Sequence, residues 1–384
     1  MLPMKQLFML DPDILFFNHG SFGATPYPVF ESLQKWQRQL EWNPVEFLGG
    51  RHHDLMLHAR SVVAKFLGTV PENLVFVTNA TTGFNIIARG LDLHPGDEVL
   101  TSDHEYGAMD RTFKYLARQK GFTYISRHVS VPIKSAEDFV DEFWQGVTPH
   151  TRVIFLSHVT SPTAAIFPIK QIAQKAQQAG ILTLIDGAHA PGQFDINLDD
   201  LGVDFYTGNL HKWVCAPKGS AFLYARPQVQ NLVEPLIVSF GWDENSTPGP
   251  NRFVDLLEWT GTRDISPYLA AADAVNFLNE HDWPQVRTYC HNLGAQIRHE
   301  LFEMTRVPSL YPDSMDWYAQ MGTASLPDDI DLNGLGSLLS KQYHIVIPLM
   351  KWNGHNLVRF SIQAYNSQQE VDTLLNAIRK FMGK

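Results

Sequence analysis

Three short segments carry side chains of the kinds that bind and activate small molecules. Residues 79–83 (NATTG) combine small residues with two hydroxyls at the predicted start of a helix, Asp186 ends an apolar run, and Lys212 lies between His211 and Trp213. Backbone N–H groups at a helix start can bind phosphate, a buried carboxylate needs a partner, and an enclosed lysine can attack a carbonyl. Taken singly, each segment also has a structural explanation, namely a helix cap, a satisfied loop aspartate or a solvated lysine.

Each of these segments follows a predicted β-strand. From about residue 70 to 225, β-rich runs alternate with amphipathic helices, a pattern typical of βαβ units in a mainly parallel sheet. The last two predicted strands have no crossover helix between them, which indicates that an antiparallel strand enters the sheet there. The carboxyl ends of parallel strands meet at one edge, so we expect the three segments to lie close together. The predicted strands are 74–78, 98–102, 122–128, 153–157, 181–185, 203–207 and 220–224.

Outside this block the sequence predicts mainly helices. A long stretch without periodicity, residues 234–252, is rich in Pro, Gly, Asn and Ser and is expected to be a surface loop. Two strands are expected near the end of the chain, at 343–347 and 357–362. The predicted helices are 26–40, 110–120, 169–180, 267–279, 284–305 and 368–382.

Combined, the three segments supply what pyridoxal phosphate requires of a protein. The cofactor needs a seat for its phosphate, an acid partner for its ring nitrogen and an amine for its aldehyde. Residues 79–83, Asp186 and Lys212 offer these parts after strands of one sheet. The combination favours a pyridoxal-phosphate enzyme over three unrelated structural explanations.

Seven motifs spread over nearly the whole chain resemble the class V aminotransferase group of fold-type I pyridoxal-phosphate enzymes, in the branch similar to isopenicillin N epimerase and cysteine desulfhydrase. The resemblance implies an α/β fold in which residues 17–263 form a large cofactor-binding domain with a seven-stranded, mostly parallel sheet. It also implies a smaller C-terminal α+β domain over residues 264–384, onto which residues 1–16 could pack. The motifs are 17–26 (FNHGSFGATP), 79–83 (NATTG), 103–108 (DHEYGA), 186–192 (DGAHAPG), 208–213 (GNLHKW), 259–264 (WTGTRD) and 358–366 (VRFSIQAYN).

The resemblance also implies roles for individual side chains. Lys212 would form the Schiff base and carry protons at the substrate α-carbon, and Asp186 would keep the ring nitrogen protonated. Arg359 would bind the substrate carboxylate through a two-pronged hydrogen bond that lysine cannot reproduce, with Asn18 as a second candidate. The other implied cofactor contacts are stacking by His104, a hydrogen bond from His189 to the phenolic oxygen, phosphate binding by Thr81, Thr82, Asn209 and His211, and phosphate binding by Thr262 across a homodimer.

The sequence leaves the reaction open between epimerisation, the nearer match, carbon–sulfur β-elimination and transamination. An epimerase needs a base on each face of the α-carbon; Lys212 can serve one face, and Tyr106 is a candidate for the other. A β-lyase of the cysteine desulfhydrase type needs only Lys212 and a good leaving group. Persulfide-forming desulfuration is disfavoured because residues 347–354, before Arg359, contain no cysteine. The non-enzyme alternative is a catalytically silent metabolite-binding α/β protein. The presence of Lys212, Asp186 and Arg359 argues against this alternative.

Composition narrows the class of protein further. A 384-residue chain with 44% hydrophobic and 18% charged residues is typical of a soluble globular protein. Its formal charge of −10 argues against a nucleic-acid partner. No membrane span or signal peptide is predicted, and the two cysteines, Cys215 and Cys290, indicate a reducing compartment, so the cytoplasm is expected. The sequence has neither HExxH nor a CxxC pair, and no metal site is expected.

Overall fold

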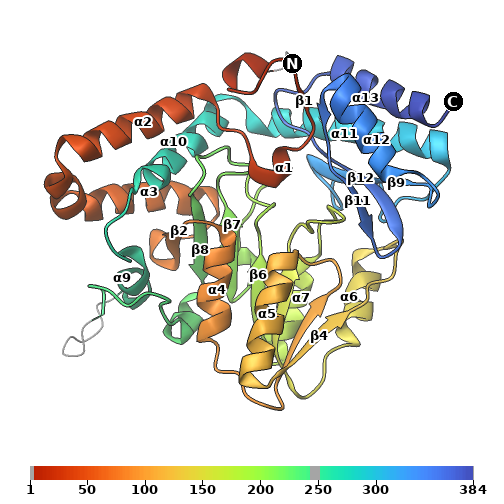
Figure 1. The fold of residues 1–384 in the computed structure, drawn as a ribbon. Coiled ribbons are helices and arrows are strands. Elements are labelled where there is room, and N and C mark those ends of the chain that lie inside the picture. Colours follow the sequence, from red (N-terminus) through yellow and green to blue (C-terminus); the bar gives the residue numbers. More distant parts are fainter. Residues whose placement is uncertain (1–3, 243–250, 384) are drawn as a thin grey trace.

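The computed structural model describes residues 4–242 and 251–383, and a seven-stranded sheet lies at its centre (Figure 1). The strands of this sheet are β2 (Leu74–Val77), β3 (Glu98–Ser102), β4 (Thr123–Arg127), β5 (Thr151–Ser157), β6 (Leu182–Asp186), β7 (Phe205–Asn209) and β8 (Ala221–Ala225). Their order across the sheet is β2-β8-β7-β6-β5-β3-β4. Strand β8 runs antiparallel to β2 and β7, and the other neighbouring pairs run parallel. The predicted mostly parallel α/β sheet and its antiparallel member are therefore confirmed.

Helices surround this sheet, and the predicted ones are confirmed within a few residues of their expected ends. The described helices are α1 (His19–Phe22), α2 (Tyr27–Trp42), α3 (His52–Phe66), α4 (Ala80–Gly90), α5 (Gly107–Lys120), α6 (Ala136–Trp144), α7 (Ile169–Gln178), α8 (Leu198–Leu201), α9 (Arg252–Glu258), α10 (Ser266–Glu280), α11 (Trp283–Thr305), α12 (Leu332–Tyr343) and α13 (Gln368–Phe381). Short 3-10 or π turns occur at Lys5–Leu7, Glu46–Gly50, Pro71–Asn73 and Pro227–Leu232.

The sheet separates two apolar cores. Successive residues of a strand point to opposite faces, and in β5 Phe155 packs against Phe84 of α4, with ring centroids 4.7 Å apart. The preceding residue, Ile154, belongs to the core on the other face together with Ile172 of α7. Helices thus cover both faces, as the continuous apolar character of the inner strands requires.

A second sheet of three antiparallel strands lies in the C-terminal part of the chain, in the order β11 (Leu349–Trp352), β12 (His355–Ser361), β9 (Met321–Leu326). The prediction for 357–362 is confirmed by β12, whereas β9, β11 and helix α12 were not predicted. Asn353 and Gly354 link β11 to β12 with φ values of 44° and 89°. Asn-Gly between two strands is a strong signal for a tight hairpin, so this part of the sequence did contain the information that would have revealed β11.

The N-terminal segment packs onto the C-terminal part of the chain. Strand β1 (Leu15–Phe16) pairs in parallel with β10 (Ile345–Val346), which is shorter than the strand predicted over 343–347. The N–H of Met4 also donates to the carbonyl of Ala364. The division of the chain at residues 263 and 264 stays a prediction. Of the predicted loop 234–252, residues 243–250 lie outside the described residues.

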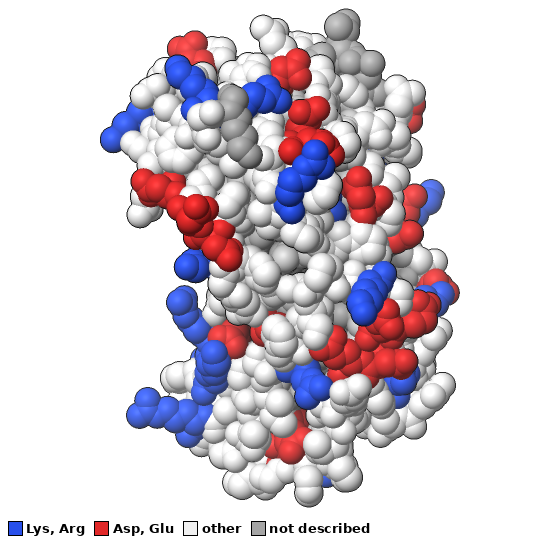
Figure 2. All heavy atoms as spheres, turned by 90° about the vertical axis from the view of Figure 1, so that its right-hand side faces the viewer, with Lys and Arg blue, Asp and Glu red and all other residues white. Residues whose placement is uncertain are grey.

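Charged side chains of both signs are scattered over the face shown in Figure 2, and its hollowed middle carries few of them. None of the helices described, over residues 4–242 and 251–383, is long and apolar enough to cross a bilayer. The same residues contain no cluster of three or more His, Cys, Asp or Glu side chains suited to a metal ion.

Candidate active site

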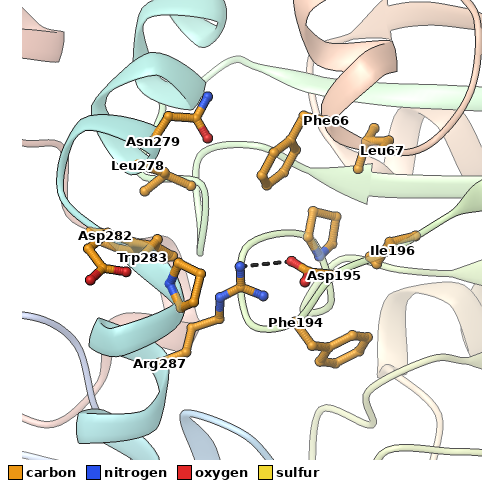
Figure 3. Close-up of a pocket in the computed structure, with 12 residues that line it drawn as sticks. Phe66, Leu67, Phe194, Asp195, Ile196, Leu278, Asn279, Asp282, Trp283 and Arg287 are labelled. Carbon is orange, nitrogen blue, oxygen red and sulfur yellow. Dashed lines mark ion pairs between the residues drawn. The ribbon is translucent and has the colours of Figure 1, made fainter.

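Size does not identify the active site, because a cavity larger than the one described below contains none of the predicted site residues. This cavity, of about 350 Å³, lies between the end of α3, the loop after β6 and the start of α11. Figure 3 shows the guanidinium of Arg287 reaching toward Asp195, and the two groups form an ion pair at 2.8 Å. The cation is thus already neutralised by a side chain of the protein, and among the described residues no amine, thiol or hydroxyl side chain lines this cavity.

The smaller cavity, of about 160 Å³, lies at the carboxyl ends of the parallel strands. Its walls come from the segments after β2, β3, β5, β6 and β7, which is where an open parallel sheet binds ligands. Among the predicted residues it is lined by Thr81, Asp186, His189, Asn209, His211 and Lys212. Its lining also includes Ser21, Tyr106, Ser157 and Ser161.

Lys212 and Asp186 reach this cavity from neighbouring strands. Asp186 is the last residue of β6 and pairs in register with Thr207 of β7, whose continuation leads to Lys212. The carboxylate is 2% exposed, accepts one hydrogen bond from the Ala188 N–H at 2.8 Å, and has a pKa raised by burial. Burial also lowers the pKa of Lys212 to about 8, which the charge of Asp186 partly opposes. The cavity therefore holds a buried carboxylate and an amine that is easily deprotonated.

The segment after β2 forms the expected helix start, and its hydroxyls point in different directions. Asn79 caps α4 by accepting from the Thr82 N–H, and Asn209 accepts from the Ala80 N–H at 2.9 Å. The Thr81 N–H has no acceptor among the described residues and stays available to an anion. Thr82 instead lines a neighbouring cavity with Arg263. A Cβ on Gly83 would lie 2.3 Å from the Thr207 hydroxyl, so the glycine allows α4 to approach β7.

Arg359 of β12 lies beside the cavity and has no acidic partner in the part of the chain that the structure describes. It is 6% exposed and donates through Nη1 to the Ser161 carbonyl at 2.6 Å and through Nη2 to the Ser21 hydroxyl at 3.4 Å. Its Nε is buried and has no acceptor among the described residues. Burial lowers the pKa of Arg359 to about 10. An unneutralised guanidinium held next to cavity-lining serines is a site for an anion.

Asn18 contributes to this arrangement indirectly. It is absent from the cavity lining, and its Oδ1 accepts from the Ser21 hydroxyl at 2.6 Å. Ser21 in turn contacts Arg359. Asn18 thus lies behind Ser21, the serine that contacts the Arg359 guanidinium. This geometry does not favour direct contact between Asn18 and the substrate.

His104 does not reach the cavity, and its predicted stacking on the cofactor ring disagrees with its place in the structure. The side chain is fully buried, bonds to the Thr163 hydroxyl at 2.8 Å and packs on Trp352 with ring centroids 4.2 Å apart. Tyr106, two residues further along, lines the cavity instead. The chain has left β3 at this point, and packing against the distant hairpin decides which side chain turns inward.

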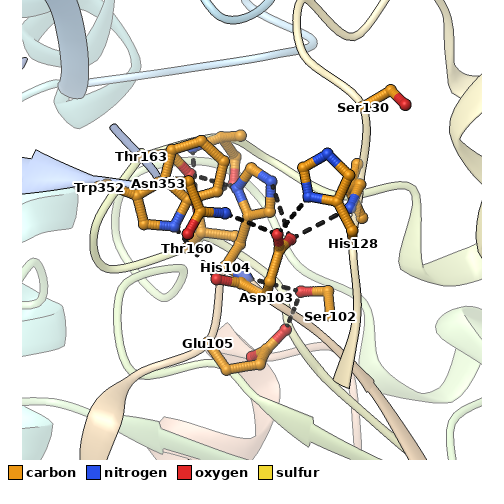
Figure 4. A network of polar contacts seen from close by, with 12 residues as sticks. Ser102, Asp103, His104, Glu105, His128, Ser130, Thr160, Thr163, Trp352 and Asn353 are labelled. Atoms are coloured by element: carbon orange, nitrogen blue, oxygen red, sulfur yellow. Dashed lines mark hydrogen bonds and ion pairs between the residues drawn. The ribbon is translucent and has the colours of Figure 1, made fainter. Parts of the chain in front are cut away.

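This hairpin, β11–β12, is held onto the large sheet by a polar network around Asp103 (Figure 4). The Asn353 amide donates to Asp103 Oδ2 at 2.6 Å, and the Trp352 indole donates to the Asp103 carbonyl at 3.1 Å. His128 bonds to the same carboxylate at 2.7 Å. Since β12 carries Arg359, these contacts fix the guanidinium relative to the cavity, and His104 belongs to this support.

Sequence reasoning missed two polar groups near the cavity. Glu105 accepts hydrogen bonds from the Ser102 and Ser157 hydroxyls, each at 2.6 Å, and burial raises its pKa to about 8. His19 Nε2 donates to the carbonyl of Lys212 at 2.9 Å and anchors the backbone that carries the amine. Both residues lie inside motifs quoted above. Their position inside these motifs, next to residues with an assigned role, was the signal that could have identified them.

Comparison with known proteins agrees with this geometry. Residues 15–374 match the family described as aminotransferase class-V. The chain is 33% identical over 382 residues to isopenicillin N epimerase of Amycolatopsis lactamdurans, and the alignment covers 97% of this chain and 96% of that protein. It is 26% identical over 403 residues to a probable chloroplastic L-cysteine desulfhydrase of Arabidopsis thaliana, covering 96% and 83%. The apo structure of a cysteine desulfurase from Thermococcus onnurineus NA1 superposes with a TM-score of 0.85 at 21% identity, covering 100% and 99%.

The fold, the cavity and the family match together define a pyridoxal-phosphate enzyme of fold type I. The chain belongs to the class V aminotransferase family. It is accordingly a pyridoxal-phosphate-dependent enzyme that acts at the α-carbon of an amino-acid or amino-acid-derived substrate.

The charges of the cavity fit this cofactor. Among the described residues, neither Lys212 nor Arg359 forms an ion pair, and Asp186 accepts only a backbone hydrogen bond. Buried charges are costly unless they are paired. A ligand that brings a protonated ring nitrogen to Asp186, an aldehyde to Lys212 and an anion to the Thr81 N–H complements these groups.

The lowered pKa of Lys212 predicts how cofactor capture depends on pH. Only the neutral amine attacks an aldehyde, and with a pKa of about 8 half of the amine is neutral at that pH and nearly all of it about one pH unit higher. We expect the rate at which apoprotein captures pyridoxal phosphate, followed by stopped-flow absorbance, to rise through about pH 8 and to level off above it. An ordinary lysine, with a pKa near 10.4, would give a rate still rising at about pH 9.5; that profile would contradict the prediction.

Proposed function

We propose that this enzyme epimerises an amino-acid centre, with Lys212 moving the α-proton on one side and Arg359 holding the α-carboxylate. The observation that carries this proposal is a pair of cations at one cavity, the Lys212 amine in its lining and the buried Arg359 guanidinium beside it, neither of which has an ion-pair partner among the described residues. A carboxylate bound at Arg359 places the adjoining α-carbon inside the cavity. The similarity to isopenicillin N epimerase supports this choice among α-carbon reactions.

The residues of the chain divide the work as follows. When bound, pyridoxal phosphate supplies an electron-withdrawing ring that stabilises negative charge at the α-carbon. Asp186 would favour a proton on the ring nitrogen, since its buried carboxylate has no cationic side chain in direct contact among residues 4–242 and 251–383. Lys212 takes the α-proton as a neutral amine and can return it. Tyr106 lines the same cavity and is our candidate for the base on the opposite side.

The remaining predicted cofactor contacts are part of this proposal. The structure puts Thr81, Asn209, His211 and His189 in the cavity lining, which supports phosphate binding by the first three and contact of His189 with the phenolic oxygen. Thr82 lines the neighbouring cavity. We therefore propose that the start of its helix, and not the Thr82 hydroxyl, contributes to phosphate binding. We propose Tyr106 in place of His104 as the side chain nearest the ring.

Product analysis in heavy water distinguishes the reactions. The purified holoenzyme is incubated in D₂O with isopenicillin N, with both enantiomers of a panel of amino acids, and with L-cysteine and L-cystine. Epimerisation is expected to give solvent deuterium at the α-carbon together with loss of optical rotation. Transfer of the amino group to the cofactor without racemisation would contradict the proposal in favour of transamination.

A second candidate is β-elimination of a carbon–sulfur bond, which one observation specifically favours. Of the residues that the structure describes, Lys212 is the only amine in the cavity lining, and elimination needs no second base. The similarity to the desulfhydrase relative agrees with this chemistry. No cysteine lines the cavity, and burial raises the pKa of both Cys215 and Cys290. Release of sulfide and pyruvate from L-cysteine would therefore indicate the lyase, and we expect no persulfide to form on the protein.

Substitution of Arg359 by lysine is expected to weaken substrate binding selectively. Lysine keeps the charge but loses the fork that binds a carboxylate through two parallel hydrogen bonds. A lost charge-assisted hydrogen bond costs about 1.5–3 kcal/mol, so KM should rise about 10- to 150-fold while the cofactor spectrum stays unchanged. The measurement is steady-state kinetics with spectra of the variant. Equal KM values for the variant and the wild type would show that the carboxylate binds elsewhere.

We further propose that the enzyme is a cytoplasmic homodimer in which Thr262 reaches the phosphate of the neighbouring active site. Thr262 is exposed, and the adjacent Arg263 lines a cavity with Thr82 at the start of α4. Phe240 and Trp242 are 92% and 53% exposed, which is unusual for aromatic side chains on an unpaired surface. These features suit an interface close to the cofactor site.

Subunit mixing tests the dimer. Lys212→Ala and Thr262→Asp chains are each expected to be nearly inactive. Refolding them together should restore part of the activity, because every mixed dimer contains one site with both native residues. Light scattering reports the mass in parallel. A monomeric mass, or no recovery in the mixture, would contradict the shared site.

A further inference from the structure

His189 lies between Trp213 and Lys212 in the wall of the cavity. The indole Nε1 of Trp213 donates to His189 Nδ1 at 3.4 Å, and His189 Nε2 lies 3.2 Å from Lys212 Nζ. Trp213 is fully buried and His189 is 5% exposed. The imidazole therefore has one defined partner on each nitrogen, and the position of its proton decides what it presents to Lys212.

The contact with Trp213 determines that position. An indole N–H can only donate, so Nδ1 must accept and carries no proton. In neutral imidazole the proton then resides on Nε2. A second proton is disfavoured because burial lowers the pKa of His189 well below its usual value, to which the neighbouring charges of Lys212, Arg359 and His211 add. The remaining form has an N–H directed at the amine.

We propose that Trp213 is a positioning residue that fixes His189 as its Nε2–H tautomer, so that His189 presents a hydrogen-bond donor to Lys212 and to the cofactor oxygen beside it. The inference rests on the proposed function for the cofactor contact, whereas the tautomer is a property of the protein alone. Sequence motifs singled out His189 but assigned no role to the residue after the lysine.

The tautomer has a consequence for Lys212. A neutral amine has a lone pair that can accept from the Nε2–H, but an ammonium group offers only donors and would meet the N–H with like polarity. The Nε2–H form thus favours the amine that reacts with an aldehyde. The other tautomer would accept from the ammonium group and stabilise it. Asp186 raises and Arg359 lowers the pKa of Lys212 in either case.

The packing around Trp213 holds the indole in place. The ring of His19 lies 5.1 Å from the Trp213 ring, and His19 also bonds to the Lys212 carbonyl. Gly192, with φ of +97°, approaches so closely that a Cβ there would lie 2.4 Å from the Trp213 carbonyl. The donor is therefore fixed by its backbone and its neighbours before any ligand binds.

Trp213→Phe tests the proposal because it keeps an aromatic ring and removes only the donor. We expect the midpoint of the pH profile for capture of pyridoxal phosphate by the apoprotein to move upward by about half to one pH unit, the size of one neutral hydrogen bond. The matched control is Trp283→Phe, which removes the N–H of another buried indole that has no acceptor among the described residues. That variant is expected to keep the wild-type midpoint.

Nitrogen-15 spectra of the histidines give an independent readout that needs no activity. In wild-type apoprotein His189 should show a protonated Nε2 and an unprotonated Nδ1, and Trp213→Phe should show a mixture of tautomers. A protonated Nδ1 in the wild type, or an unchanged capture profile in Trp213→Phe, would overturn the inference. If wild-type protein captured no cofactor, the proposed function would fail, while the tautomer would still be decided by the spectra.

Discussion

Lys212→Ala is expected to abolish turnover and to leave the purified protein without covalently held cofactor. Among the described residues, the Lys212 side chain is the one amine in the cavity lining and also our proposed base, so its loss removes two functions at once. General-base catalysis alone typically contributes 10²–10⁴-fold, and we expect activity to fall by about 10⁴-fold or more. Turnover, visible absorbance and the mass of the borohydride-treated protein measure these effects.

The matched control for this substitution is Lys218→Ala in the same loop. Lys218 donates to the Gly23 carbonyl at 3.1 Å and does not line the cavity. Its alanine variant should stay yellow and should give the borohydride adduct on Lys212. Normal turnover by Lys212→Ala, or an adduct on Lys218 in the wild type, would refute the assignment of the nucleophile.

Asp186→Asn is expected to retain the bound cofactor and to lose about 10²–10³-fold in turnover. Asparagine can still accept from the Ala188 N–H but cannot hold a proton on the ring nitrogen by its charge. The magnitude is that observed when a single preorganised electrostatic partner of developing charge is removed. Asp186 also raises the pKa of Lys212, so the capture profile of the variant should move to lower pH.

The thermal stability of the Asp186→Asn apoprotein distinguishes a loss of catalysis from misfolding. Burial raises the pKa of Asp186, which means that its ionised form is less favourable in the folded apoprotein than in the unfolded chain above the ordinary carboxyl pKa. The apo form of Asp186→Asn should therefore unfold at the same temperature as the wild type or higher near neutral pH. The control Asp195→Asn changes an exposed carboxylate of the nearby loop and should keep its activity. Wild-type turnover by Asp186→Asn would contradict the proposed role.

The sequence alone determined which segments meet in the active site. Residues 79–83, Asp186 and Lys212 each follow a strand that periodicity could predict, and parallel strands bring the loops at their carboxyl ends to one edge of the sheet. The antiparallel β8 could be predicted for an equally local reason, the lack of a crossover helix before it. These conclusions depend on short-range pattern and on the chirality of βαβ units, and both are written into neighbouring residues.

Only the tertiary structure decided which way individual side chains point. His104 and Tyr106 are two residues apart, yet the first packs under Trp352 and the second lines the cavity. Arg359 is positioned by the hairpin β11–β12, which a hydrogen bond from Asn353 attaches to Asp103. These two residues lie about 250 positions apart in the sequence. The direction of a side chain beyond the end of a strand depends on such distant packing partners, and local periodicity carries no information about them.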